Sequence, residues 1–163
     1  MKKLLLTLPF CAALSCTSDN IQESNINMLA AGKWFLSGVI TDFTISETGD
    51  TKQINIFDLP ICPECLKDDK LEIFSRGEYE IQLGENLCFN NIQIFKLPHN
   101  GSWQFTHDEK GIILNPGSPD SIPMDITSLT QTELKLTYYD TIPQILFKND
   151  SSVQAITFFY THE

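Results

Sequence analysis

Short runs of alternating apolar and polar residues, separated by turn residues, dominate the chain from about residue 33 onward. The clearest example is the pair of segments 70–75 and 78–83, which alternate on either side of Arg76-Gly77 and predict an antiparallel hairpin. The same pattern predicts further strands, with a bend or bulge at Gly38 in the first of them. These strands cover residues 33–46, 52–59, 101–106, 112–115, 124–129, 133–139 and 153–161, with a candidate short strand at 92–96.

Eight to ten strands that follow one another through turns predict an all-β fold. We favour an antiparallel up-and-down barrel of about eight strands, because each strand can then pair with its neighbour in sequence. A two-sheet β-sandwich is the alternative, since the period of the strands and the spacing of the turns do not separate the two architectures.

The first fifteen residues have the layout of a secretory signal peptide. Lys2 and Lys3 are followed by the mostly apolar run 4–14, which is shorter than the roughly 20 apolar residues that a membrane-spanning helix needs. Ala13-Leu14-Ser15 then precedes Cys16 and resembles the lipobox of bacterial lipoproteins. We therefore expect cleavage before Cys16 and acylation of this residue, with palmitate among the chains. Ordinary signal cleavage, which would leave Cys16 as a thiol, is the alternative.

The predicted organisation is a signal peptide over residues 1–15, a tether over 16–29 and one folded domain over 30–163. The tether is polar, and a short helical turn is expected where Ile26, Met28 and Leu29 begin to repeat. The rest of the chain is long enough for one domain with a hydrophobic core. This layout predicts a lipoprotein of the cell envelope, held to the lipid bilayer through Cys16. The outer membrane is favoured over the inner one, and the face of the membrane is left open.

The chain is acidic, with a formal net charge of −10 at pH 7. This sign argues against nucleic acid as a partner and against docking by charge on an anionic membrane. It is compatible with a neutral or cationic partner, and equally with a simple role in solubility. We expect a monomer without a cofactor.

Several short motifs follow one another in order along the folded domain. They are Gly32-Lys33-Trp34, Cys65-Leu66-Lys67-Asp68-Asp69, an F-x-x-G-x-Y hairpin at Phe74, Gly77 and Tyr79, then Cys88, Gly101-Ser102-Trp103, Ile126-Thr127-Ser128-Leu129 and Leu134-Lys135-Leu136. In this order they resemble the lipocalin-like domain family of Bacteroidetes lipoproteins. The resemblance implies a lipocalin-type barrel with Trp34 at its closed end, and it implies little about chemistry. The chain departs from the family in its extra Cys62 and in Phe159-Tyr160-Thr161, where many relatives carry a basic residue.

Cys65 and Cys88 occupy the positions of a cysteine pair in that family, so the resemblance implies a disulfide between them. They flank the predicted hairpin, whose pairing would bring its ends together, and an exported location permits the bond. Cys62 and Cys65 also form a C-x-x-C spacing, which could instead be a redox pair or half of a zinc site. His99 is the candidate fourth ligand of such a site, although nothing else supports one, and we expect no metal.

No catalytic constellation stands out, and we do not expect an enzyme. The sequence has no G-x-S-x-G elbow, and His99, His107 and His162 are far apart. Asp68-Asp69 lacks the further oxygen ligands of a calcium loop and is interpreted as a solvated turn. The carboxylates of the first hairpin fall on polar faces, so no glycosidase pair is indicated.

Two tripeptides, Asp120-Ser121-Ile122 and Asp140-Thr141-Ile142, resemble the acceptor sequence of Bacteroidetes O-glycosylation. Ser121 and Thr141 are the candidate acceptors. Both fall in predicted loops, where a glycan can be accommodated.

The interior of an eight-stranded barrel is either filled by side chains or just wide enough for one small ligand. Alternation points five residues inward, where they would line a ligand site or form the core: Trp34, Tyr79, Trp103, Phe105 and Leu136. Our first hypothesis is a binding protein for a small apolar or amphipathic molecule. The second is a non-enzymatic interaction or accessory module with a filled barrel, whose loops contact a protein or a glycan.

Overall fold

The structure is a computed structural model, and it describes residues 25–44, 50–58, 66–85, 97–141 and 153–162. These residues form β-strands, a 3-10 helix η1 (Ile56–Asp58) and a helical turn at 25–29. The strands are β1 (Lys33–Thr44), β2 (Thr51–Asn55), β3 (Lys70–Phe74), β4 (Glu78–Gln82), β5 (Asn100–Phe105), β6 (Gly111–Leu114), β7 (Ile122–Leu129), β8 (Glu133–Thr141) and β9 (Val153–His162).

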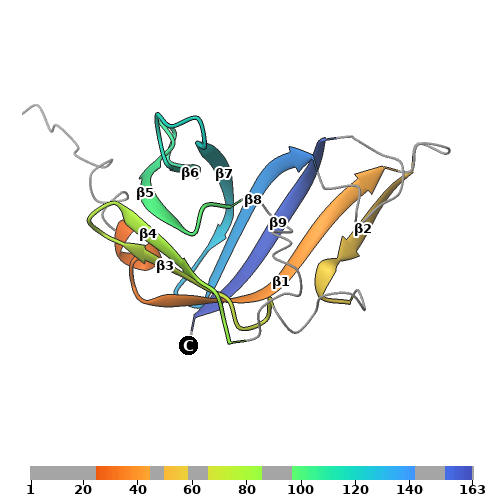
Figure 1. The fold of residues 1–163 in the computed structure, drawn as a ribbon, viewed down its shortest axis with the longest axis horizontal. Helices are drawn as coiled ribbons and strands as arrows, with labels where there is room; N and C mark the ends of the chain where they lie inside the picture. The colour runs from red at the N-terminus through yellow and green to blue at the C-terminus, as the bar shows by residue number, and fades with distance from the viewer. Residues whose placement is uncertain (1–24, 45–49, 59–65, 86–96, 142–152, 163) are drawn as a thin grey trace, which may run out of the picture.

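Eight of these strands close into an antiparallel up-and-down barrel (Figure 1). Consecutive strands pair from β3 through β9, and β1 completes the wall by pairing with β3 on one edge and β9 on the other. The closing β1–β9 ladder is antiparallel like all the others. The predicted barrel is therefore confirmed, and the two-sheet sandwich is wrong.

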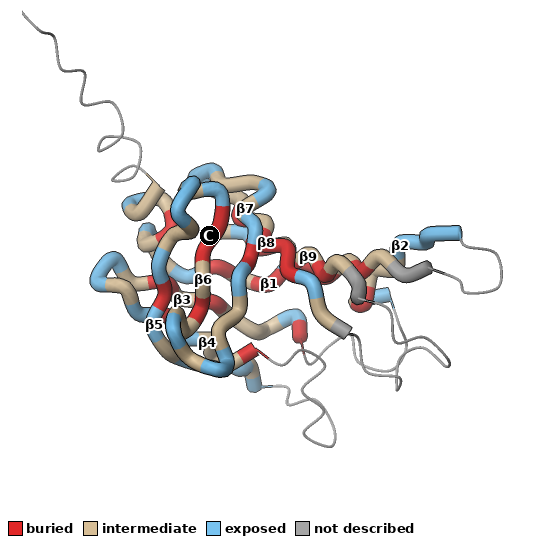
Figure 2. Tube along the Cα trace, turned by 90° about the horizontal axis from the view of Figure 1, so that it is seen from above, coloured by how far each residue is buried: buried red, intermediate tan, exposed pale blue. Residues whose placement is uncertain are grey.

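Strand β1 serves two partners on one edge because it is long and irregular. Its first residues, Lys33–Phe35, pair with β3, whereas Ile40–Thr44 pair with β2. The register with β9 shifts between Leu36 and Gly38, which confirms the bulge predicted at Gly38. Strand β2 is the ninth strand and lies outside the barrel wall, with its first three residues exposed at the far side of the molecule (Figure 2).

The predicted strand over residues 52–59 is wrong in its second half. The chain leaves the ladder after Asn55 and turns into η1. The side-chain oxygen of Asn55 accepts a hydrogen bond from the backbone N–H of Phe57 at 3.1 Å. This local bond gives the backbone an alternative to strand pairing, and asparagine favours it in turns.

The two ends of the barrel differ in the length of their connections. Short turns join β3 to β4, β5 to β6 and β7 to β8 at one end, which we call the turn end; β1 begins and β9 finishes there. At the opposite end, which we call the loop end, β1, β4, β6 and β8 finish and β3, β5, β7 and β9 begin. At the turn end, Leu29 of the helical turn at 25–29 is buried and accepts a hydrogen bond from the indole N–H of Trp34.

Trp34 lies at the turn end, where the family resemblance implies it. Its side chain is 0% exposed, and its indole N–H donates a hydrogen bond to the backbone oxygen of Leu29 at 2.8 Å. His162 is its register partner on β9 and packs edge-on against the indole, with ring centroids 5.3 Å apart. His162, a basic residue, therefore contacts Trp34. It lies one position after Phe159-Tyr160-Thr161, the motif in which many members of the resembled family carry a basic residue.

Apolar side chains from the loop end also reach the core. Ile56 of η1, Leu66 and Leu97 are buried and join one cluster with the inward residues of the strands. The barrel is thus filled by side chains near the turn end and covered in part by residues of the connections at the loop end.

Candidate functional site

Four of the five inward candidates are fully packed in this core. Trp34, Tyr79, Trp103 and Leu136 are buried, and Phe105 is partly buried against the same cluster. The polar atoms of two of them are satisfied inside the protein. The indole N–H of Trp103 donates to the backbone oxygen of Phe74 at 3.0 Å, and the Tyr79 hydroxyl donates to that of Pro98 at 3.2 Å. Their inward orientation is confirmed, while contact with a ligand stays a prediction.

A row of aromatic residues on the inner face of β8 and β9 was not singled out from the sequence. The rings of Tyr138 and Phe158 are stacked with centroids 5.7 Å apart, and those of Phe158 and Tyr160 lie 6.2 Å apart. All three side chains are buried. Leu134 and Leu136 alternate with polar residues, and one further step of this alternation predicts that Tyr138 also faces inward.

The hydroxyl group of Tyr138 is buried without a hydrogen-bond partner within the described part of the chain. The residue is 4% exposed. Burial is the largest cause that raises the pKa of this phenol, and the charge of Asp140 raises it further. Buried hydroxyl groups are normally hydrogen-bonded, so this one is available to an additional polar partner.

Tyr160, the last ring of this row, lies near the carboxylate of Asp69. Burial raises the pKa of its phenol, and the charges of Asp69 and Tyr138 add to this effect. The backbone explains the proximity of Asp69. Leu36 donates its backbone N–H to the carbonyl oxygen of Asp69 at 3.1 Å and is also the register partner of Tyr160. Asp69 and Tyr160 therefore flank the same residue of β1.

The turn predicted at Asp68-Asp69 is present at residues 66–68, and Asp69 follows it half-buried. Desolvation raises the pKa of its carboxyl most strongly, and the charge of Asp68 adds to the rise. Its Oδ1 accepts a hydrogen bond from the backbone N–H of Gly84 at 3.0 Å, which, like His99, opposes the rise. The sequence reasoning missed the partial burial of Asp69 because the alternation of Leu71 and Ile73 was not carried two residues back, where it places Asp69 on their face of the strand.

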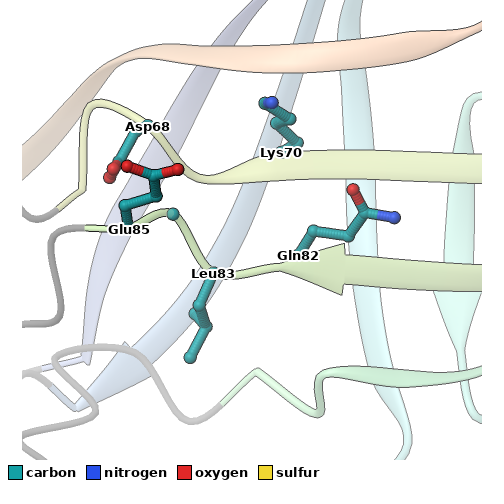
Figure 3. A pocket seen from close by; sticks show the side chains of 6 residues that line it. Asp68, Lys70, Gln82, Leu83 and Glu85 are labelled. Atoms are coloured by element: carbon teal, nitrogen blue, oxygen red, sulfur yellow. The ribbon is translucent and has the colours of Figure 1, made fainter.

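A pocket of about 440 Å³ opens at the loop end, where β3 begins and β4 ends. In Figure 3 the carboxylates of Asp68 and Glu85 lie close together at one end of it, and Lys70 and Gln82 lie along the paired strands at the other. Gly84 allows this arrangement, because a Cβ atom there would overlap the carboxylate of Asp68. Its residues are Asp68, Lys70, Gln82, Leu83, Gly84 and Glu85.

The candidate sites for covalent modification fall mostly elsewhere. Cys16 and the cysteines Cys62, Cys65 and Cys88 lie outside the described residues. Ser121 lies in the turn before β7, as predicted, whereas Thr141 is the last residue of β8 and pairs with Val153. The loop prediction for Thr141 was wrong because the β8–β9 ladder extends two residues beyond the expected end at Tyr139, and threonine is well suited to a strand.

Two properties hold for the described residues alone. They contain no group of three His, Cys, Asp or Glu side chains that could hold a metal ion. They also contain no helix long and apolar enough to cross a membrane.

The fold and the loop-end pocket define the class of this protein as a closed eight-stranded up-and-down β-barrel. No protein-family model matches the chain, and no curated protein is significantly similar to it. The resemblance to lipocalin-like lipoproteins therefore stays a prediction from the ordered motifs.

Proposed function

We propose that this chain is a membrane-anchored, non-enzymatic binding protein of the cell envelope, whose barrel takes a small amphipathic ligand at the loop end. The observation that carries the proposal is the pocket of about 440 Å³ at that end. Its volume falls in the range of small-molecule sites, roughly 300–1,000 Å³. The anchor is proposed from the signal peptide and Cys16, and the compartment, preferably the outer membrane, follows from the same residues.

The filled half of the barrel limits the size of the ligand in the first hypothesis, a binding protein for a small apolar or amphipathic molecule. The half of the barrel near the turn end is filled by residues such as Trp34, Leu134 and Phe158, all of which are at most 2% exposed. A long apolar tail cannot enter this half without displacing packed side chains. We therefore propose a compact ligand with a polar group, held in the loop-end pocket beside Asp68, Lys70 and Glu85.

The same filled half also favours a second candidate function. A solid barrel can serve as a rigid support for loops that contact a protein or a glycan. In that case the long connections at the loop end would form the contact surface, and no small molecule would be needed.

Native mass spectrometry of the protein extracted from the envelope of its host tests the proposed function. We expect an acylated Cys16 and a fraction of the protein that carries a small molecule, released on denaturation. A Cys16→Ser variant is the control and should lose the acyl chains and the membrane association but not the small molecule. An unmodified Cys16 would contradict the anchor, and protein that never carries a small molecule but retains a protein or glycan would favour the second function.

A further inference from the structure

The loop-end pocket is built from two short segments that are held against each other. Lys70, the first residue of β3, is the register partner of Gln82, the last residue of β4. Beyond this pair, the backbone N–H of Gly84 donates to the carboxylate of Asp69 at 3.0 Å. The Cα atoms of Asp68 and Lys70 are two residues apart and are therefore separated by at most about 7 Å. The lining side chains of both segments thus lie within reach of one small molecule.

Glu85 and Lys70 present opposite charges to this pocket without pairing with each other. Among the residues that the structure describes, neither side chain forms an ion pair. The ammonium group of Lys70 lies over the ring of Phe35, 5.0 Å from the centroid. The carboxylate of Asp68 lies close to that of Glu85 and adds to the negative charge at that end of the pocket (Figure 3). The pocket therefore has an acidic end and a basic end, and both are open to a ligand.

The neighbouring charges on the outer face of β3 and β4 are already engaged. Lys33 lies 3.7 Å from the carboxylate of Glu72 and donates a hydrogen bond to the side-chain oxygen of Gln82 at 3.2 Å. The amide nitrogen of Gln82 in turn donates to Glu72 at 3.4 Å. Lys70 is thus the cation that the described lining residues offer to a ligand.

Leu83 gives the same pocket an apolar surface. Its side chain is 49% exposed, and it shares this property with Tyr139 on β8 among the large hydrophobic residues that the structure describes. Leu83 lies between Gln82 and Gly84, so its exposed surface borders the charged groups of the pocket. An apolar group of a ligand would remove this surface from water, which is favourable.

We propose that the loop-end pocket binds a zwitterionic amino acid with an apolar side chain, whose ammonium group pairs with Glu85 and whose carboxylate pairs with Lys70. Asp68 adds to the attraction of the ammonium group, and the apolar side chain packs against Leu83. This inference rests on the proposed function and specifies its ligand class. A simple amine would use only the acidic end of the pocket. A simple carboxylic acid would use only Lys70 and would be repelled by the two carboxylates.

NMR titrations with three probes that share one carbon skeleton test this proposal. The probes are L-phenylalanine, 2-phenylethylamine, which lacks the carboxylate, and 3-phenylpropionate, which lacks the ammonium group. Each is added at neutral pH and low ionic strength to the ¹⁵N-labelled full-length protein in a non-ionic detergent. We expect L-phenylalanine to shift the amide signals of Leu83 and Gly84 and to bind at least about threefold more tightly than either analogue, since each exposed ion pair contributes modestly. Added salt should remove most of this difference, because it screens exposed charges.

Two variants assign the two charges of the ligand to the two ends of the pocket. Glu85→Gln should weaken L-phenylalanine and 2-phenylethylamine about threefold each and should not weaken 3-phenylpropionate. Lys70→Gln should weaken L-phenylalanine and 3-phenylpropionate about threefold each and should not weaken the amine. The matched controls are Glu80→Gln on β4 and Lys110→Gln before β6, which change exposed residues outside the pocket and should leave all affinities unchanged. Thermal unfolding of each variant establishes that it is folded.

The outcomes separate this inference from the function on which it rests. An analogue that binds as tightly as L-phenylalanine, or unchanged L-phenylalanine affinity in either pocket variant, would overturn the zwitterionic ligand but not the binding function. Absence of shifts at Leu83 and Gly84 with all three probes would overturn the zwitterionic ligand as well. If native mass spectrometry then also finds no bound small molecule, the proposed function falls with it.

Discussion

Replacing Trp34 with alanine is expected to lower the free energy of unfolding by about 3–5 kcal/mol. The side chain is 0% exposed at the turn end, where its register partners Leu71 and His162 enclose it from both neighbouring strands. Its removal would leave a cavity and would also leave the backbone oxygen of Leu29 without its donor. Urea unfolding followed by circular dichroism measures the change.

Two further variants separate packing from hydrogen bonding at this site. Trp34→Phe keeps a ring but loses the N–H donor, and we expect a smaller loss of about 1–3 kcal/mol. Tyr139→Ala removes a side chain that is 64% exposed and should change the free energy by no more than about 0.5 kcal/mol. If Trp34→Ala costs no more than the Tyr139 control, the packing described for the turn end is wrong.

Replacing Gly111 with alanine is expected to destabilise the barrel by about 1–3 kcal/mol. Gly111 begins β6 and is the register partner of Asp125 on β7. A Cβ atom at Gly111 would overlap the backbone oxygen of Met124 and would lie 3.3 Å from the Cα atom of Asp125. Both are backbone atoms, so relief requires the two strands to move apart. Chemical unfolding again gives the measurement.

Gly38→Ala is the matched control for this prediction. Its Cβ atom would meet Phe159 at 3.7 Å, an ordinary contact distance, and neither glycine has a positive φ. The Gly38 variant should therefore lie within about 0.5 kcal/mol of the parent protein. Equal losses at both positions would show that the β6–β7 contact is not as close as described.

The alternation of apolar and polar residues predicted most of the strands and the inner face of the barrel. In β3, for example, Leu71 and Ile73 are buried as their spacing indicates. The same pattern could not show which strands pair across long separations. The contact of β1 with β9 joins positions as distant as Trp34 and His162, and the period of a strand contains no information about its partner. The position of β2 outside the wall was unpredictable for the same reason.

The candidate site was less accessible to sequence reasoning than the fold. Trp34, Tyr79, Trp103 and Leu136 were found because large apolar residues at inward positions are conspicuous, and the structure shows that they are core. Asp69 was dismissed because a pair of aspartates after a loop is typical of a solvated turn. It is half-buried between Leu36 of β1, which donates to its backbone oxygen, and Gly84 after β4, which donates to its carboxylate.

The central claim is that the protein binds a small amphipathic ligand at the loop end of its barrel, and an NMR titration tests it most directly. Two-dimensional ¹⁵N–¹H spectra recorded with increasing 2-phenylethanol, a compact amphipathic probe, report which backbone amides change their surroundings. We predict saturable shifts at the pocket, including Asp68, Gln82 and Gly84, and unchanged signals at the turn end, including Gly77 and Thr132. Shifts confined to the turn end, with none at Asp68 and Gly84, would contradict the claim.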